Sequence, residues 1–153
     1  MPIKANQLGD SVLTFGELYE VNDFLSANQL TTGLEEGVTA VPAPGANTIA
    51  IIRYVEFSFE VGINRYTTGS PIFLRYKDAD GTVATSSGFN STYLLGTEDR
   101  RFLSRWGLNL NVFTTTGKET INQPIIFRAT TNYEAGDGIL KYQIKYNKVS
   151  TII

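Results

Sequence analysis

Carboxylates are the main groups of this 153-residue chain that can do chemistry, because the sequence contains neither histidine nor cysteine. It therefore offers no Ser–His or Cys–His nucleophile pair. Glu56 and Glu60 share one face of a predicted strand, but glycoside hydrolysis needs two acids that face each other across a sugar. We expect both acids to pair with cross-strand cations such as Arg75 or Lys77. The sequence predicts a protein that is not an enzyme.

Metal sites are restricted to oxygen ligands for the same reason, since zinc and other transition metals favour nitrogen and sulfur. The segment DADG (78–81) has two aspartates and a glycine, like the start of a calcium loop, but it lacks the later ligands and the closing glutamate. A hairpin turn explains this segment without a metal. Glu134 and Asp137 lie in a second loop, where only the folded geometry decides whether they face a cation. We predict neither a metal nor a cofactor.

Basic and aromatic residues are interleaved in TEDRRFLSRW (97–106), a pattern that can bind single-stranded nucleic acid through charge and stacking. Two acidic residues adjoin the arginines, and the net charge of −2 argues against a nucleic-acid surface. We expect Phe102 and Trp106 to anchor this segment to the core while the arginines extend along the surface or form ion pairs. The alternative is that the arginines contact an acidic neighbouring subunit.

The charge of the chain is unevenly distributed. Residues 1–52 contain six acidic residues and one basic residue, whereas the remainder contains nine acidic and twelve basic ones. An acidic leading segment can pair with a basic body between subunits, although a solvated face explains the same pattern. No apolar run approaches the length of a membrane span, so we predict no membrane partner.

Period-two alternation of apolar and polar residues predicts that most of the chain folds into short strands. The stronger candidates are 55–61, 72–77, 108–113, 125–130 and 140–147, and the weaker ones are 29–34, 37–41 and 91–95. TIAIIRY (48–54) is apolar at both parities, so it is either buried on both faces or bulged near Arg53. After DADG, TVATS returns as the second strand of a hairpin. Turn residues between these segments predict an all-β fold, an antiparallel β-sandwich of the jelly-roll kind.

Two segments depart from this pattern. Between residues 11 and 25 the apolar residues fit both helical and strand spacing. We therefore predict an N-terminal arm of undetermined structure over residues 1–28 and a single β-sandwich domain over residues 29–153. Residues 97–106 are predicted to form a short helix or turn, because Thr97 suits an N-cap and two acidic residues follow it.

Two stretches of the sequence resemble small virion proteins of tailed bacteriophages. In VPAPGANTIAIIRYVEFSFEVGINRYTTGSPIFLRY (41–76), a Pro/Gly connector leads into a long apolar strand, then a loop with tyrosine, then a strand that ends in L-x-Y. NQPIIFRATTNYEAGDGILKYQIKYNKV (122–149) resembles the closing hairpin of those proteins, with a Gly-Asp-Gly turn and a last strand bearing K-Y-x-x-K-Y. The likeness covers residues 37–149 and consists of layout and turn chemistry, without a catalytic motif.

This resemblance implies a non-enzymatic structural protein on the virion surface, most of all a capsid decoration (cement) protein that stabilises the shell. Proteins of this kind sit on the major capsid protein as homotrimers, and an N-terminal arm often reaches a neighbour. The residues expected at such subunit or capsid contacts are Phe15, Leu18, Tyr19, Arg100, Arg101 and Arg105. The alternative is a head or tail fibre module that binds a receptor or glycan through the Tyr- and Asn-bearing loops TTNYEAGDG and SSGFNST.

Overall fold

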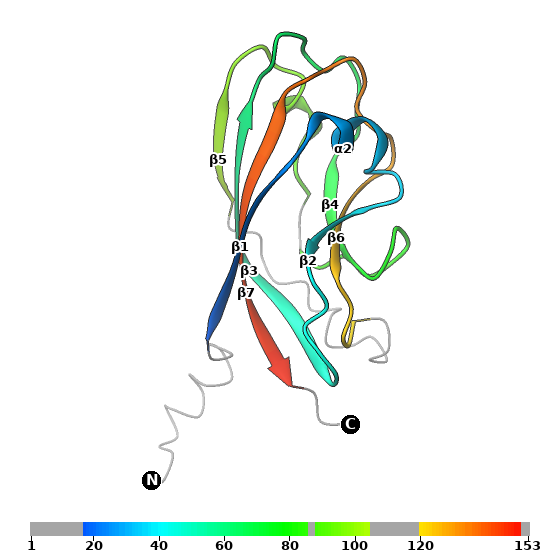
Figure 1. Ribbon diagram of the computed structural model, residues 1–153, viewed down its shortest axis with the longest axis vertical. Helices are drawn as coiled ribbons and strands as arrows, with labels where there is room; N and C mark the ends of the chain where they lie inside the picture. The colour runs from blue at the N-terminus through cyan, green and yellow to red at the C-terminus, as the bar shows by residue number, and fades with distance from the viewer. Residues whose placement is uncertain (1–16, 86–87, 105–119, 151–153) are drawn as a thin grey trace, which may run out of the picture.

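The computed structural model describes residues 17–85, 88–104 and 120–150, which are mostly strand. The elements in chain order are β1 (Leu18–Leu25), α2 (Ala27–Thr32), β2 (Val38–Val41), β3 (Thr48–Glu60), β4 (Ile72–Tyr76), the 3₁₀ helix η1 (Ser91–Tyr93), β5 (Arg100–Ser104), β6 (Ile125–Ala129) and β7 (Ile139–Ser150) (Figure 1). The predicted all-β fold class is confirmed for the described residues, which contain almost no helix. Within the described ranges, no helix has the length and hydrophobicity needed to cross a membrane.

The strands form two antiparallel sheets, one with the order β1-β7-β3-β5 and one with the order β2-β6-β4. Their pairing is nested along the chain: β1 pairs with β7, β2 with β6, and β3 with β5. At the centre of this nest, single bridges join β4 to Val83 and Phe89. The backbone amide of Tyr76 donates to the carbonyl of Thr82 at 2.9 Å, so the turn predicted at DADG is confirmed, but the described part of the returning segment forms a single bridge at Val83 and no strand. The chain thus runs out and back as one long folded ribbon.

The core lies between the two sheets and is built from the inward-facing residues of both. The Phe127 ring on β6 meets the Tyr142 ring on β7 edge to face at 4.7 Å between ring centroids, and it lies 6.2 Å from the Phe57 ring on β3. The buried hydroxyl of Tyr76 on β4 also donates a hydrogen bond to the carbonyl of Ala50 on β3. Aromatic packing and this buried hydrogen bond therefore hold the two sheets face to face.

Strand β3 shows both features that its sequence left open. Residues 49–52 are all buried, so this part of the strand is covered on both faces. The pairing of β3 with β7 then shifts register between Ile52 and Tyr54, which leaves Arg53 as an exposed bulge. A bulge returns the strand to simple alternation, because one extra residue changes which parity faces the core. From Val55 onward the inward residues are again the apolar ones.

Two of the weaker strand predictions are wrong. Residues 29–34 were expected in a strand, but most of them belong to α2, whose N-cap is Ser26. The Ser26 hydroxyl accepts from the backbone amide of Gln29 at 3.1 Å, and the Gln29 side chain accepts from the backbone amide of Ser26 at 2.9 Å. This reciprocal capping box starts a helix whatever the strand propensity of the residues that follow. Residues 91–95 start with the 3₁₀ turn η1, where the Asn90 side chain accepts from the amide of Thr92.

The expected helix or turn over residues 97–106 is also wrong for residues 100–104, which form strand β5. This strand pairs antiparallel with β3, from Phe59 opposite Arg100 to Val55 opposite Ser104. The sheet thus supplies backbone hydrogen bonds that outweigh a weak local preference for a turn. The predicted strand 108–113 lies outside the described residues.

Part of the predicted N-terminal arm, residues 18–25, lies in the four-stranded sheet. Leu18–Leu25, placed by the sequence in the arm 1–28, form β1 and pair with β7 along its whole length. The expected closing hairpin is corrected as well, because β6 and β7 belong to different sheets and residues 130–138 cross between them. Strand parity, the alternative that the sequence offered for residues 18–25, is what the structure adopts.

Candidate functional site

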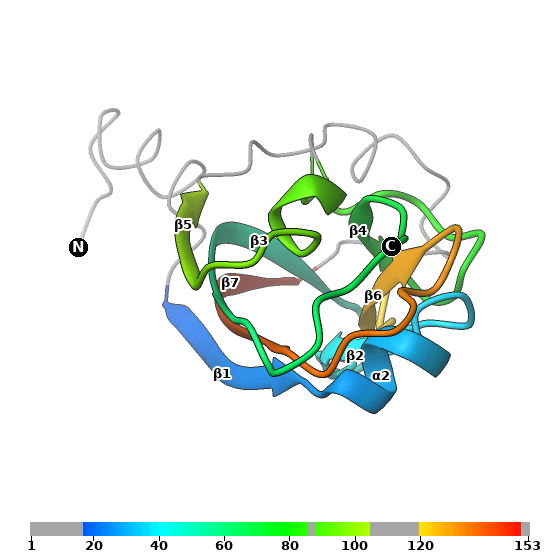
Figure 2. The same ribbon diagram turned by 90° about the horizontal axis from the view of Figure 1, so that it is seen from above.

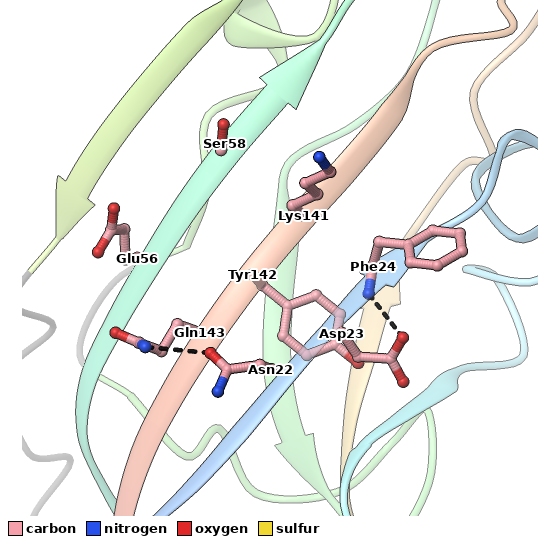
Figure 3. A pocket seen from close by; sticks show the side chains of 8 residues that line it. All are labelled: Asn22, Asp23, Phe24, Glu56, Ser58, Lys141, Tyr142 and Gln143. Atoms are coloured by element: carbon pink, nitrogen blue, oxygen red, sulfur yellow. Dashed lines mark hydrogen bonds between the residues drawn. The ribbon is translucent and has the colours of Figure 1, made fainter.

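A shallow pocket of about 380 Å³ lies on the outer face of the four-stranded sheet. Residues of β1, β3 and β7 line it: Asn22, Asp23, Phe24, Glu56, Ser58, Lys141, Tyr142 and Gln143 (Figure 3). Strand alternation turns most of these side chains to this face, whereas Asp23 and Tyr142 lie at the alternate positions of β1 and β7. The pocket is therefore a product of three strands that lie side by side, and no single motif encodes it.

Strand register aligns the outward side chains into rows. Gln143 lies between Asn22 and Glu56, and the next row places Lys141 between Phe24 and Ser58. Each row offers hydrogen-bond donors and acceptors next to one another. The Phe24 side chain adds an exposed aromatic ring at the β1 end of the second row. Such a surface suits a polar ligand with an apolar face.

Hydrogen bonds and one ion pair fix several of these side chains. The Gln143 Nε2 donates to the Asn22 Oδ1 at 3.0 Å and also to a carboxylate oxygen of Glu20. The Tyr54 hydroxyl donates to the Glu56 Oε2 at 3.0 Å. These contacts orient amide and carboxylate groups at the pocket without bringing two carboxylates into contact. The arrangement can bind through hydrogen bonds, and it contains no nucleophile paired with a base.

The partners expected for Glu56 and Glu60 are corrected. The Glu60 carboxylate forms an ion pair with the Lys141 ammonium at 2.5 Å between Oε1 and Nζ, both largely exposed. Arg75 belongs to β4 in the other sheet, where its guanidinium donates to the carbonyl of Gly81 at 3.0 Å. Lys77 follows directly after β4. The sequence identified the outward face of β3 but not the strand that lies beside it.

The residues expected at subunit contacts do not form one cluster. Leu18 and Tyr19 lie on β1, whereas Arg100 and Arg101 lie on β5, at the opposite edge of the same sheet (Figure 2). Three strand spacings, or about 14 Å, separate these two edges. Phe15 and Arg105 lie outside the described residues. The predicted contact residues thus mark two separate edges.

Apolar side chains are concentrated on β1 among the residues that the structure describes. The large hydrophobic residues with high exposure are Leu18 at 53%, Phe24 at 48%, Tyr19 at 37% and Ile63 at 96%. Three of these four belong to β1. The Tyr19 ring stacks on Tyr146 at 5.7 Å, and the Lys148 ammonium lies 4.2 Å from the centroid of the Tyr19 ring. Leu18 and Phe24 lie six residues apart on β1, and alternation turns Tyr19 to the other face, so these exposed side chains do not form one contiguous patch.

The acidic loop residues have structural partners. In the DADG turn, the Asp78 Oδ1 accepts from the backbone amide of Asp80 at 3.0 Å. In the second loop, the Asp137 Oδ1 accepts from the backbone amide of Asn64 at 2.9 Å. No group of three or more acidic side chains gathers in the part of the chain that the structure describes. These carboxylates stabilise the loops that contain them.

Two buried tyrosines join the loop 61–71 to the loop 130–138. The Tyr66 hydroxyl donates to the carbonyl of Gly138 at 2.6 Å, and the Tyr133 hydroxyl donates to the carbonyl of Ser70 at 2.8 Å. Their rings meet edge to face at 5.6 Å. Tyr133, which the sequence placed in a loop for receptor or glycan contact, is thus part of the packing between the loops. In SSGFNST, Phe89 is likewise buried and packs on Phe57 at 4.5 Å.

Burial raises the pKa of several tyrosines. Burial and the nearby Asp137 carboxylate raise the pKa of Tyr66 to about 12. Burial and the Asp23 carboxylate raise the pKa of Tyr142 to about 12. Burial also raises the pKa of Tyr76 and of Tyr133. In each case the low polarity of the core disfavours the tyrosinate anion.

We expect the protein to lose stability between about pH 10 and about pH 12. An unfolded tyrosine ionises near pH 10, whereas the folded state keeps Tyr66 and Tyr142 protonated to higher pH. Between these pH values the folded state binds more protons than the unfolded state. The free energy of unfolding is therefore highest below pH 10 and falls as the pH rises toward 12. Urea denaturation across this range measures the fall. If tyrosinate absorbance reached its full value while the protein stayed folded, the assignment would be contradicted.

Sequence reasoning missed the pocket because its residues come from three distant segments. The period-two pattern does predict that Glu56, Lys141 and Gln143 face outward. It does not say that β7 lies between β1 and β3, and this order is what brings Asn22 and Phe24 to the same place. Comparison with protein families and with curated proteins finds nothing that matches this sequence. We therefore infer its function from the geometry of the residues that the structure describes.

Proposed function

We propose that this chain is a non-enzymatic structural protein of a phage virion, a capsid decoration protein that binds the shell surface and its own copies. The observation that carries the proposal is the nested pairing of β1 with β7, β2 with β6 and β3 with β5. This nesting supports the jelly-roll interpretation, and at its centre Val83 and Phe89 each form a single bridge to β4. Jelly rolls are common in viral capsid and lectin domains.

The energetics of the fold support a role in holding a shape. The described core joins both sheets through large aromatic side chains. A decoration protein needs a rigid body and a surface for neighbours, and the exposed apolar residues of β1 supply such a surface. Many copies on one shell can attach strongly through individually weak contacts.

The first test is the copy number of this chain in purified virions, measured by quantitative mass spectrometry against the major shell protein. We expect a ratio close to that of the shell protein. A ratio many times smaller would contradict decoration and place the chain in a fibre or tail. Absence from the virion would overturn the proposal.

The pocket on the outer face favours a second candidate, a fibre module that binds a glycan. Hydroxyl groups of a sugar match the amides of Asn22 and Gln143, and its apolar face matches the Phe24 ring. The two loops first considered for this role are less suited to it, because Tyr133 and Phe89 are buried in the packing.

A glycan array tests this second candidate directly. We expect any saturable glycan signal to be lost in the double variant Asn22→Ala/Gln143→Ala and to remain in Ile63→Ala, a control on an exposed loop. A signal that survives the double variant would exclude this pocket. The absence of any saturable glycan would remove the sugar version of the fibre reading.

A further inference from the structure

Two aspartates of this chain are followed directly by a glycine, and the structure places them in different surroundings. Asp80 precedes Gly81 in the DADG turn, and Asp137 precedes Gly138 in the loop between β6 and β7. In such a pair the glycine nitrogen can attack the carboxyl group of the aspartate, because the glycine has no side chain to block the approach. The contacts around each pair therefore decide whether this reaction takes place in the folded protein.

The Asp137–Gly138 pair is held by its contacts. The Asp137 Oδ1 accepts from the backbone amide of Asn64 at 2.9 Å. Gly138 is buried, and its carbonyl accepts from the Tyr66 hydroxyl at 2.6 Å. For the Gly138 nitrogen to reach the Asp137 carboxyl carbon, a charge-assisted hydrogen bond would have to break. The fold thus protects this pair.

The Asp80–Gly81 pair has much less protection. Asp80 is exposed, and its carboxylate accepts no hydrogen bond and forms no ion pair with the residues that the structure describes. Two hydrogen bonds to Asp78 hold the turn: the Asp80 amide donates to its Oδ1 at 3.0 Å, and the Gly81 amide donates to its carbonyl at 3.0 Å. Hydrogen bonds in an exposed turn open locally while the sheet stays folded, and such opening frees the Gly81 nitrogen.

We propose that Asp80–Gly81 is a site of spontaneous backbone isomerisation, where aspartate converts to isoaspartate in the folded protein. The Gly81 nitrogen bonds to the Asp80 carboxyl carbon and loses its proton, while one carboxyl oxygen leaves as water and a succinimide ring closes. Water then adds to the main-chain carbonyl of Asp80 and breaks its bond to the Gly81 nitrogen. The backbone now runs through the former side chain. One water leaves and one returns, so the atoms balance without a co-reactant.

The isomerised backbone is longer by one carbon atom, and the turn is packed too closely to absorb it. A Cβ added to Gly81 would lie 1.6 Å from the carbonyl oxygen of Tyr76. Two hydrogen bonds depend on this spacing: the Tyr76 amide donates to the Thr82 carbonyl at 2.9 Å, and the Arg75 guanidinium donates to the Gly81 carbonyl at 3.0 Å. Isomerisation therefore opens the DADG turn beside β4. This inference concerns one turn and does not depend on the proposed function.

Peptide mapping of aged protein tests both pairs in one experiment. The full folded chain is incubated at neutral pH in water enriched in heavy oxygen, then digested and analysed by liquid chromatography and mass spectrometry. The isoaspartyl peptide separates from the aspartyl peptide and contains one oxygen from the solvent. We expect isoaspartate to form at Asp80 at least about tenfold faster than at Asp137, because only Asp137 must first release a hydrogen bond to its carboxylate.

The chain unfolded in guanidinium chloride is the control for local sequence, since unfolding removes the contacts of both pairs. We expect Asp80 and Asp137 to isomerise at similar rates in this state. Equal rates at the two sites in the folded protein would overturn the proposal. So would the absence of isoaspartate at Asp80 in the folded protein over the time in which the unfolded chain converts.

Asp80→Glu is the matched variant for the effect on the turn. It keeps the negative charge and the backbone amide that donates to Asp78, but its longer side chain closes the corresponding ring far more slowly. We expect aged wild-type protein to unfold at a lower urea concentration than fresh protein, and aged Asp80→Glu to unfold like fresh Asp80→Glu. Wild-type protein that contains isoaspartate at position 80 and unfolds like fresh protein would contradict the opening of the turn.

Discussion

Replacing Phe127 with alanine is expected to lower the free energy of unfolding by about 3–5 kcal/mol. The Phe127 side chain is fully buried between the two sheets. Its ring contacts Tyr142 on β7 and lies near Phe57 on β3, so the substitution leaves a cavity where both sheets meet. Because rigid strands surround this cavity on two sides, the structure can collapse only partly to fill it. Urea denaturation followed by tyrosine fluorescence or circular dichroism measures the loss.

Phe24→Ala is the matched control, since it removes the same atoms from an exposed position on β1. We expect this variant to change the free energy of unfolding of the monomer by no more than about 0.5 kcal/mol. Equal losses in Phe127→Ala and Phe24→Ala would contradict the assignment of the core. A large effect of Phe24→Ala that appears only at high protein concentration would instead point to the interface on β1.

Gly69→Ala is expected to destabilise the protein by about 1–3 kcal/mol. A Cβ at this position would lie 2.2 Å from a ring carbon of Tyr133. That ring cannot easily move, because it is buried and its hydroxyl donates to the carbonyl of Ser70 at 2.8 Å. The substitution therefore forces apart the two loops that the tyrosines join. Thermal or urea unfolding measures the effect.

A double-mutant cycle separates this clash from other effects of the substitution. Tyr133→Ala removes the ring atoms that meet the new methyl group, whereas Tyr133→Phe keeps them. We expect Gly69→Ala to be much less destabilising in the Tyr133→Ala background than in the Tyr133→Phe background. Identical effects of Gly69→Ala in both backgrounds would show that the ring is not the obstacle.

The fold could be predicted from the sequence where strand alternation was long and regular. The strands β3, β4, β6 and β7 follow period-two patterns, and the tight turn after β4 follows its turn residues. Helix α2 was missed although Ser26 and Gln29 carry a capping-box signature. Strand β5 was missed because its five residues depend on pairing with β3, which local sequence does not encode.

The site was harder to predict than the fold, for a physical reason. Alternation indicates which side chains point outward, but register and strand order decide which of them become neighbours. The sequence suggested contacts at Leu18, Tyr19, Arg100 and Arg101, and it suggested acidic-to-basic pairing between subunits. It did not show that these residues occupy the two edges of one sheet.

The pairing of β1 with β7 also sets a condition on the synthesis of this protein. The Asn147 side chain of β7 donates to the carbonyl of Glu17, 130 residues earlier in the chain. At ribosomal elongation rates, roughly ten seconds pass between the synthesis of β1 and the synthesis of β7, the strand with which it pairs. During that time the nascent chain presents Leu18, Tyr19 and Phe24 without their neighbour, in a fold whose closing contacts are all distant in sequence. A cell that makes this protein in quantity must keep crowded, half-made copies from pairing with one another too early.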